Sequence, residues 1–153
     1  MKRIMPIFVV ILMIGPSVLL AANYEPGYSS SHALVVGINK YHLWPHLEYA
    51  VKDATEVAAM LRVRGFQIRI LTDEKATRKN ILDQLGTIRR SVDVNSRVVF
   101  YFAGHGQTED LPSGRERGYI VPVDADTYNW NDTMLRMDQL NNTIRDIMAK
   151  HVF

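Results

Sequence analysis

One apolar run, residues 97–103, constrains the fold more than any other feature. Its sequence is Arg-Val-Val-Phe-Tyr-Phe-Ala, and its β-branched and aromatic side chains are typical of a strand buried on both faces. The run stops at Gly104-His105-Gly106, where the missing Cβ of glycine permits unusual torsions and a close ligand approach. Because open α/β sheets bind ligands at the carboxyl ends of their strands, His105 is the first candidate functional residue. The alternative interpretation is an ordinary loop histidine after a core strand.

In the residues before this run, segments with the apolar pattern of a strand alternate with segments that have the apolar pattern of a helix. A buried strand is predicted over residues 32–38, a helix over 47–62 that ends at Gly65, and a half-exposed edge strand over 66–70. Thr77 is predicted to cap a second helix, whose buried face is Ile81, Leu82, Leu85, Ile88 and Val92. The order strand, helix, strand, helix, strand favours an α/β fold with a parallel sheet and right-handed crossovers.

The residues after His105 are less regular. Residues 107–118 are predicted to form a polar loop long enough to be mobile, and residues 119–123, with Pro122, an edge or hairpin strand. Asp138 is predicted to cap a helix with Leu140, Ile144, Ile147 and Met148 facing inward. Residues 151–153 read as the start of a fourth core strand. Since strands usually run about five or six residues, the sequence is expected to hold most of an α/β domain, incomplete at its C-terminus.

The first 22 residues have the pattern of an export signal peptide. Lys2 and Arg3 precede an apolar run, and Ala21 with Ala22 offers a small-residue cleavage site. An uncleaved membrane anchor over residues 4–22 is the alternative, because the run approaches spanning length. The protein is therefore predicted to be periplasmic or secreted, and in contact with a membrane only if this segment stays attached. Residues 23–31 read as a linker.

Charge and composition exclude several classes of function. Two of the 18 basic residues lie in residues 1–22, which leaves 16 basic and 16 acidic side chains and no indication of a nucleic-acid partner. The five histidines show no metal-ligand spacing, and no dinucleotide or Walker glycine pattern is present, so neither metal nor cofactor is expected. There is no Gly-x-Ser-x-Gly elbow. There is also no cysteine, which excludes disulfides and thiolate ligands from this sequence.

A Cys–His mechanism is the chemistry that a histidine in this position suits best. An imidazole after a buried strand can take a proton from a thiol and pass it to a leaving amine. The neighbouring amide of Gly106 can donate to the developing oxyanion. In such an arrangement the nucleophile usually comes from another strand.

Six segments, taken in order, resemble the large-subunit half of caspase-like peptidases, with the bacterial members and the metacaspases as the most similar groups. They are residues 32–41 (HALVVGINKY), 49–54 (YAVKDA), 64–66 (RGF), 76–81 (ATRKNI), 101–107 (YFAGHGQ) and 118–125 (GYIVPVDA). The resemblance covers residues 32–153. It implies a caspase–haemoglobinase fold, a three-layer sandwich with a mainly parallel sheet, cysteine endopeptidase ancestry, and a peptide or protein substrate without a cofactor.

The resemblance also implies roles for four residues. His105 matches the catalytic histidine, and Gly106 matches the amide of the oxyanion hole. Asp53 matches the acidic residue that lines the pocket for a basic P1 side chain in metacaspase-type members, while Ala103 stands where metacaspases often place serine in that pocket. A solvated helix residue paired with Lys52 is the alternative interpretation of Asp53.

The nucleophile is the departure from the family pattern. In caspases the histidine precedes the cysteine by about 50 residues, which puts the thiol near position 155, whereas this sequence runs to Phe153. The expectation is a caspase-like domain over residues 32–153, truncated before its cysteine and inactive alone. A non-catalytic binding module that uses the crevice near His105 is the alternative. A flavodoxin-like regulatory domain is a third, although Asp73 and Asp124 lack an accompanying acidic cluster.

Overall fold

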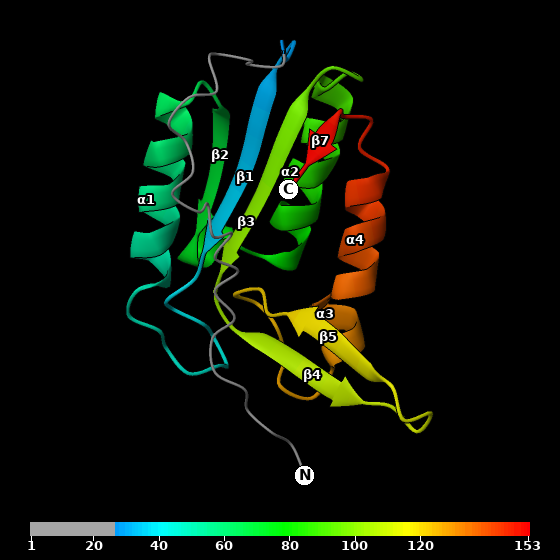
Figure 1. Cartoon of the computed structure of the whole chain (residues 1–153). Helices are drawn as coiled ribbons and strands as arrows, with labels where there is room; N and C mark the ends of the chain where they lie inside the picture. Colours follow the sequence, from blue (N-terminus) through cyan, green and yellow to red (C-terminus); the bar gives the residue numbers. More distant parts are fainter. Residues whose placement is uncertain (1–26) are drawn as a thin grey trace, which may run out of the picture.

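The continuous apolar runs of the sequence form the centre of a parallel sheet. The computed structural model describes residues 27–153, so the predicted signal or anchor (1–22) and the first four residues of the predicted linker (23–26) lie outside the described residues. Four strands pair in the order β2-β1-β3-β7, all parallel (Figure 1). They are β1 (Ser31–Gly37), β2 (Gln67–Thr72), β3 (Arg97–Ala103) and β7 (His151–Val152). Within residues 27–153, no helix has the length and apolar character needed to cross a membrane.

The predicted parallel pairing and the half-exposed edge strand are confirmed. β2 lies at one edge and is only partly buried, as its alternating sequence indicates. At the other edge, β7 pairs with the start of β3 in the register Arg97↔His151 and Val98↔Val152. The last residues therefore enter the sheet as its fourth strand, but as a largely exposed edge strand and not as the core strand that was predicted.

Helices cover both faces of this sheet, which makes the three layers that were predicted. Figure 1 shows α1 (Ala50–Val63) on one side, with α2 (Arg78–Ser91) and α4 (Met137–Arg145) on the other. Successive side chains of β1 point to opposite faces of the sheet, so they contribute to two separate hydrophobic cores. Ala33 and Val35 belong to the cluster that contains the α1 side chains Ala54, Ala58 and Leu61. Leu34 and Val36 belong to the cluster that contains the α2 side chains Ile81, Leu85 and Ile88. Burial on both faces explains the unbroken apolar run of β1, whereas β3, predicted to be equally buried, is only partly buried along most of its length.

The end of α1 and the start of α2 follow local sequence, whereas α1 begins at Ala50 and not at the predicted residue 47. The Thr77 hydroxyl accepts the Asn80 N–H at 3.1 Å, and Gly65 follows α1 with φ 81°, both as predicted. The prediction that Asp138 caps the last helix is wrong: α4 begins at Met137, without a capping side chain. The carboxylate of Asp138 instead pairs with Arg136. Met148 was predicted to face inward but is 70% exposed, because it lies beyond the end of α4.

The polar segment after His105 is a hairpin and not the mobile loop that was predicted. β4 (Gly106–Asp110) and β5 (Glu116–Ile120) pair antiparallel, and β6 (Leu135–Arg136) adds a third strand. Polar pairs hold the hairpin: the Tyr119 hydroxyl donates to Glu109 at 2.7 Å, and Gly114 makes the turn with φ 77°. Figure 1 shows this small sheet beyond the carboxyl ends of the main strands. Two short helical turns, η1 (Asp73–Lys75) and α3 (Trp130–Thr133), complete the fold.

Candidate active site

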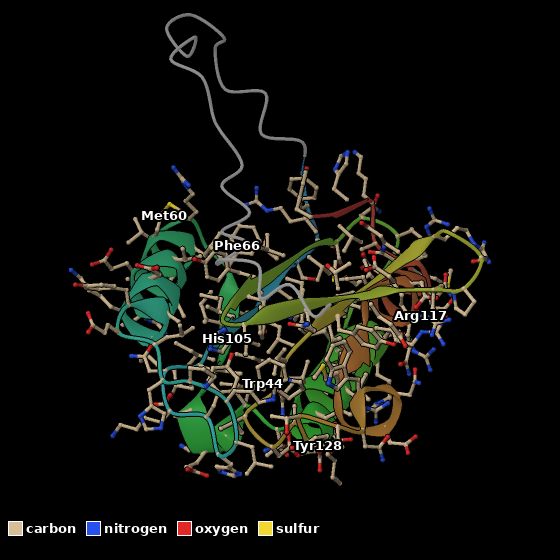
Figure 2. The ribbon with its side chains drawn as sticks, turned by 90° about the horizontal axis from the view of Figure 1, so that it is seen from below. Trp44, Met60, Phe66, His105, Arg117 and Tyr128 are labelled. Carbon is tan, nitrogen blue, oxygen red and sulfur yellow. The ribbon has the colours of Figure 1, made fainter. Side chains whose placement is uncertain are left out.

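The carboxyl edge of the main sheet carries His105, two residues beyond the end of β3. Seen from this edge, His105 lies between α1 and the hairpin, with Trp44 close by (Figure 2). The loop that follows β1, residues 38–49, supplies the side chains around the imidazole. The ring centroid of His105 is 4.9 Å from that of Tyr41 and 6.0 Å from that of Trp44. The histidine is thus supported on one side by an aromatic surface.

One hydrogen bond determines which nitrogen of the imidazole is available. Nε2 of His105 lies 2.8 Å from the carbonyl oxygen of Pro45. A carbonyl only accepts hydrogen bonds, so Nε2 carries the hydrogen in the neutral ring and Nδ1 is left as a bare acceptor. Within residues 27–153, Nδ1 of His105 makes no hydrogen bond. The ring is therefore oriented and tautomerically set to receive a proton at Nδ1.

The backbone of His105 is held as firmly as its ring. Its N–H donates to the hydroxyl of Tyr41 at 2.8 Å, and burial raises the pKa of this phenol far above its ordinary value of 10. Tyr41 therefore stays neutral. A Cβ on Gly104 would collide with the Tyr41 hydroxyl and the Phe102 ring, so close approach demands glycine there. Neither Gly104 nor Gly106 has a left-handed backbone, so the unusual torsions considered from sequence are not used.

The amide of Gly106 faces away from the hairpin's hydrogen-bond ladder. Gly106 and Ile120 are opposite each other in the antiparallel register, and the Val121 N–H donates to the His105 carbonyl at 3.0 Å. In that pattern Gly106 belongs to a non-hydrogen-bonded pair, and its N–H points out from β5. β4 is the edge strand of its sheet. The amide of Gly106 is thus open to an acceptor next to His105.

Asp73 anchors the loop that carries Pro45. One oxygen of its carboxylate accepts the N–H groups of Asn39 at 2.7 Å and Lys40 at 2.9 Å. Further along the loop, the indole N–H of Trp44 donates to the Ala125 carbonyl at 3.1 Å. These bonds fix both halves of the loop and so place the Pro45 carbonyl under the imidazole. Sequence reasoning missed the roles of Tyr41, Pro45 and Asp73, although Asp73 was noted as an aspartate at a strand end.

Asp53 and Ala103 lie on the α1 side of the same edge. Asp53 is in the first turn of α1, and burial together with the charge of Asp53 raises the pKa of Tyr101 on β3. Ala103, two residues along the strand from Tyr101, shares its face and lies beside Gly37 of β1. Lys52, the partner considered for Asp53 in the alternative interpretation, instead pairs with Glu56 at 3.9 Å. Within residues 27–153, no cation pairs with Asp53.

The other histidines near this edge form no metal site. His42 pairs with Glu74 at 2.9 Å, and His46 lies exposed in the same loop. In the described part of the chain, no three histidine, aspartate or glutamate side chains gather closely enough to hold a metal ion.

Comparison with known proteins gives matches to one family. The sequence model described as the caspase domain matches residues 30–153. Metacaspase-1 of Meyerozyma guilliermondii is 32% identical over 106 residues, which cover 60% of this chain and 26% of that protein. Metacaspase-1 of Mycosarcoma maydis is 28% identical over 122 residues, which cover 69% and 30%. The chain thus spans less than a third of the length of these relatives.

A solved structure shows the same fold. The crystal structure of a protein from Geobacter sulfurreducens superposes with a TM-score of 0.68 at 22% sequence identity. The similarity covers 81% of this chain and 49% of that one.

Proposed function

The chain belongs to the caspase domain family, and on this premise we propose that it forms the histidine-bearing part of a cysteine endopeptidase centre. In this proposal His105 is the general base and Gly106 donates to the oxyanion. The observation that supports it most is the bond from Nε2 of His105 to Pro45, which leaves Nδ1 bare at the sheet edge. The match to the caspase domain family argues against the flavodoxin-like alternative.

The chemistry follows from that tautomer. Nδ1 of His105 takes the proton of a thiol, and the Pro45 carbonyl stabilises the imidazolium by accepting from Nε2. The thiolate attacks the peptide carbonyl, and the amide of Gly106 donates to the oxygen as it becomes negative. The imidazolium then gives its proton to the leaving amine. Apart from the thiol, the groups that these steps use are held in place by the fold before substrate arrives.

The thiol is the missing part, since the sequence holds no cysteine. β7 runs parallel to β3 and directly beside it, with Val152 opposite Val98. A chain continuing along β7 would come level with Ala103 about five residues later, because parallel strands advance by the same rise per residue. In this proposal, a cysteine near that position would face Nδ1 of His105. Without the thiol His105 has nothing to activate, and residues 1–153 are expected not to hydrolyse peptides.

The charge on Asp53 supports an arginine or lysine P1 side chain. Its carboxylate has no cationic partner within residues 27–153 and lies on the same side of the sheet edge as Ala103. In a form of the protein extended past residue 153 to include a cysteine, Asp53→Asn is expected to lower kcat/KM for arginine substrates more than for neutral ones. Glu56→Gln, on an exposed carboxylate of the same helix, is the matched control.

The full chain and an extended form test the proposal. In the 153-residue protein, nitrogen NMR should show His105 protonated at Nε2 and bare at Nδ1 when neutral. The reading frame continued past codon 153 should encode a cysteine, and the extended protein should cleave fluorogenic peptides. His105→Gln should reduce kcat about 10²- to 10⁴-fold, as loss of a general base does, while His46→Gln in the exposed loop should not. Turnover that persists in His105→Gln contradicts the proposal.

A non-catalytic binding module is the second candidate, and the absence of cysteine from the sequence favours it. It predicts that the 153-residue chain binds peptides beside His105 and that the continued reading frame encodes no cysteine. A cysteine on the β7 extension together with His105-dependent turnover decides against it.

We also propose that residues 1–22 direct export, on the basis of Lys2, Arg3 and the apolar run that follows them. N-terminal sequencing of the protein from cell fractions tests this. A mature protein that begins near Asn23 supports a cleaved signal, an intact N-terminus in the membrane fraction supports the anchor, and an intact protein in the cytoplasm contradicts both.

A further inference from the structure

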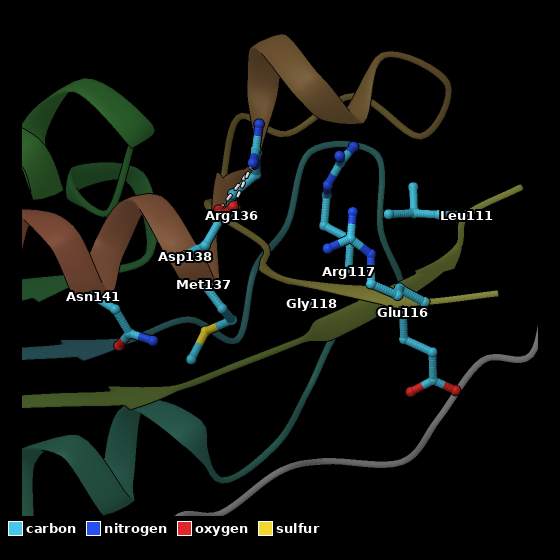
Figure 3. Close-up of a pocket in the computed structure, with 9 residues that line it drawn as sticks. Leu111, Glu116, Arg117, Gly118, Arg136, Met137, Asp138 and Asn141 are labelled. Carbon is cyan, nitrogen blue, oxygen red and sulfur yellow. Dashed lines mark hydrogen bonds and ion pairs between the residues drawn. The ribbon is translucent and has the colours of Figure 1, made fainter. Parts of the chain in front are cut away.

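A hollow of about 380 Å³ lies between β5 and the first turns of α4, away from the candidate active site (Figure 3). Figure 2 shows Arg117, one of its lining residues, well apart from His105. Three arginines line the hollow: Arg115, Arg117 and Arg136. The proposed peptidase centre does not use these arginines.

One wall of the hollow is an open strand edge. β6 pairs only with Tyr119 and Ile120, so the first three residues of β5 have β4 on one side and the hollow on the other. The bond from Leu111 N–H to the Arg115 carbonyl, at 2.8 Å, sets the alternation of the β4–β5 ladder. In that alternation the N–H and carbonyl of Glu116 point away from β4 and toward the hollow. This edge can therefore accept another strand.

The arginine side chains gather on one face of this edge. Arg115 directly precedes β5, Arg117 is two residues further along, and Arg136 is opposite Tyr119, so all three share a face. Glu116 is on the other face, and Figure 3 shows its side chain turned away from Arg117.

The carboxylates nearby do not satisfy these guanidinium groups. Glu109 lies 3.4 Å from Arg117, and Asp138 pairs with Arg136. In residues 27–153, no carboxylate pairs with Arg115, whose closest hydrogen-bond contact is Ser113 at 3.5 Å. Since each guanidinium has five N–H donors, the face keeps capacity for additional anions.

We propose that this hollow binds an acidic peptide segment of a partner protein, added as an extended strand beside β5. The segment's backbone pairs with the N–H and carbonyl of Glu116. Its carboxylates, at alternate positions, pair with Arg115 and Arg117, because side chains on one face of a strand recur every second residue. Apolar side chains between them, on the other face of the added strand, contact Met137, which also lines the hollow. Strand addition of this kind takes affinity from the main chain and specificity from the side chains.

Binding of two matched hexapeptides to the 153-residue protein tests the charge requirement. Fluorescein-labelled Glu-Thr-Glu-Val-Glu-Thr should bind saturably by fluorescence anisotropy at low salt, and Lys-Thr-Lys-Val-Lys-Thr should not. Arg115→Glu with Arg117→Glu should weaken binding of the acidic peptide at least tenfold. Arg89→Glu with Arg90→Glu, on exposed residues in the last turn of α2, makes the same change in net charge and should leave affinity within twofold. If the first double variant unfolds, Arg115→Glu alone replaces it, because Arg115 is exposed.

Backbone methylation tests the strand geometry. The acidic hexapeptide with N-methyl groups on alternate amides keeps its charge but loses the donors that pair with β5, and should bind at least tenfold more weakly. Equal binding of the two charged peptides, undiminished binding to the double variant, or undiminished binding of the methylated peptide overturns the proposal. Tighter binding of a single-stranded DNA oligomer at this face also overturns it, in favour of phosphate recognition. None of these results depends on the role proposed for His105 in the peptidase centre.

Discussion

Replacing Tyr41 with phenylalanine removes one oxygen and isolates one interaction of the candidate site. The ring that packs 4.9 Å from the His105 imidazole is kept, whereas the acceptor of the His105 N–H is lost. A buried donor left without an acceptor costs about 1–3 kcal/mol. Since Tyr41 is only 3% exposed, water cannot readily replace the hydroxyl. We expect the free energy of unfolding to fall by about that amount.

The loss of stability in Tyr41→Phe should be concentrated at the backbone of His105. If opening is local, about 1–3 kcal/mol corresponds to hydrogen exchange of the His105 amide roughly 5- to 150-fold faster, at about 1.4 kcal/mol per tenfold change. Urea unfolding gives the global free energy, and amide exchange followed by NMR gives the local one. Tyr49→Phe is the matched control, because Tyr49 is 64% exposed. Unchanged stability together with unchanged exchange at His105 would refute the role assigned to Tyr41.

Three further predictions concern the same fold. Gly104→Ala should destabilise the protein by about 1–3 kcal/mol, because the new Cβ meets the Tyr41 hydroxyl; Gly106→Ala, whose nearest neighbour would be a carbonyl oxygen at 3.6 Å, should cost less, and equal urea midpoints for the two would contradict the packing argument. The free energy of unfolding should fall as the pH rises above about 10, because burial raises the pKa of Tyr41 and the unfolded chain therefore loses this proton first. In Tyr41→Phe this part of the pH dependence should be absent. An identical pH dependence in the two proteins would contradict the assignment to Tyr41. Thr77→Ala should cost about 1 kcal/mol by removing the cap of α2, measured by urea unfolding, and a loss below about 0.3 kcal/mol would show that the cap contributes little.

Much of the fold could be predicted because its signals are local. The run that forms β3 is apolar or aromatic at every position after Arg97, and the buried residues of α2 recur at helical spacing, so each element is recognisable within a dozen residues. The β4–β5 hairpin was missed because its strands are polar. Its stability comes from cross-strand pairs, such as Tyr119 with Glu109, that no single segment reveals. The start of α4 was misplaced because Asp138 turns back to Arg136.

The candidate site divides in the same way. That His105 follows a strand and is followed by Gly106 can be read from the chain, because a strand, its end and its neighbours are consecutive residues. Which nitrogen of His105 is free, and what holds its backbone, depends on the folded arrangement. Pro45 and Tyr41 lie 60 and 64 residues away in sequence, and they reach the histidine because β1 and β3 are neighbours in the sheet. Periodicity carries information about the face a residue occupies, whereas contacts between distant loops depend on how whole elements pack.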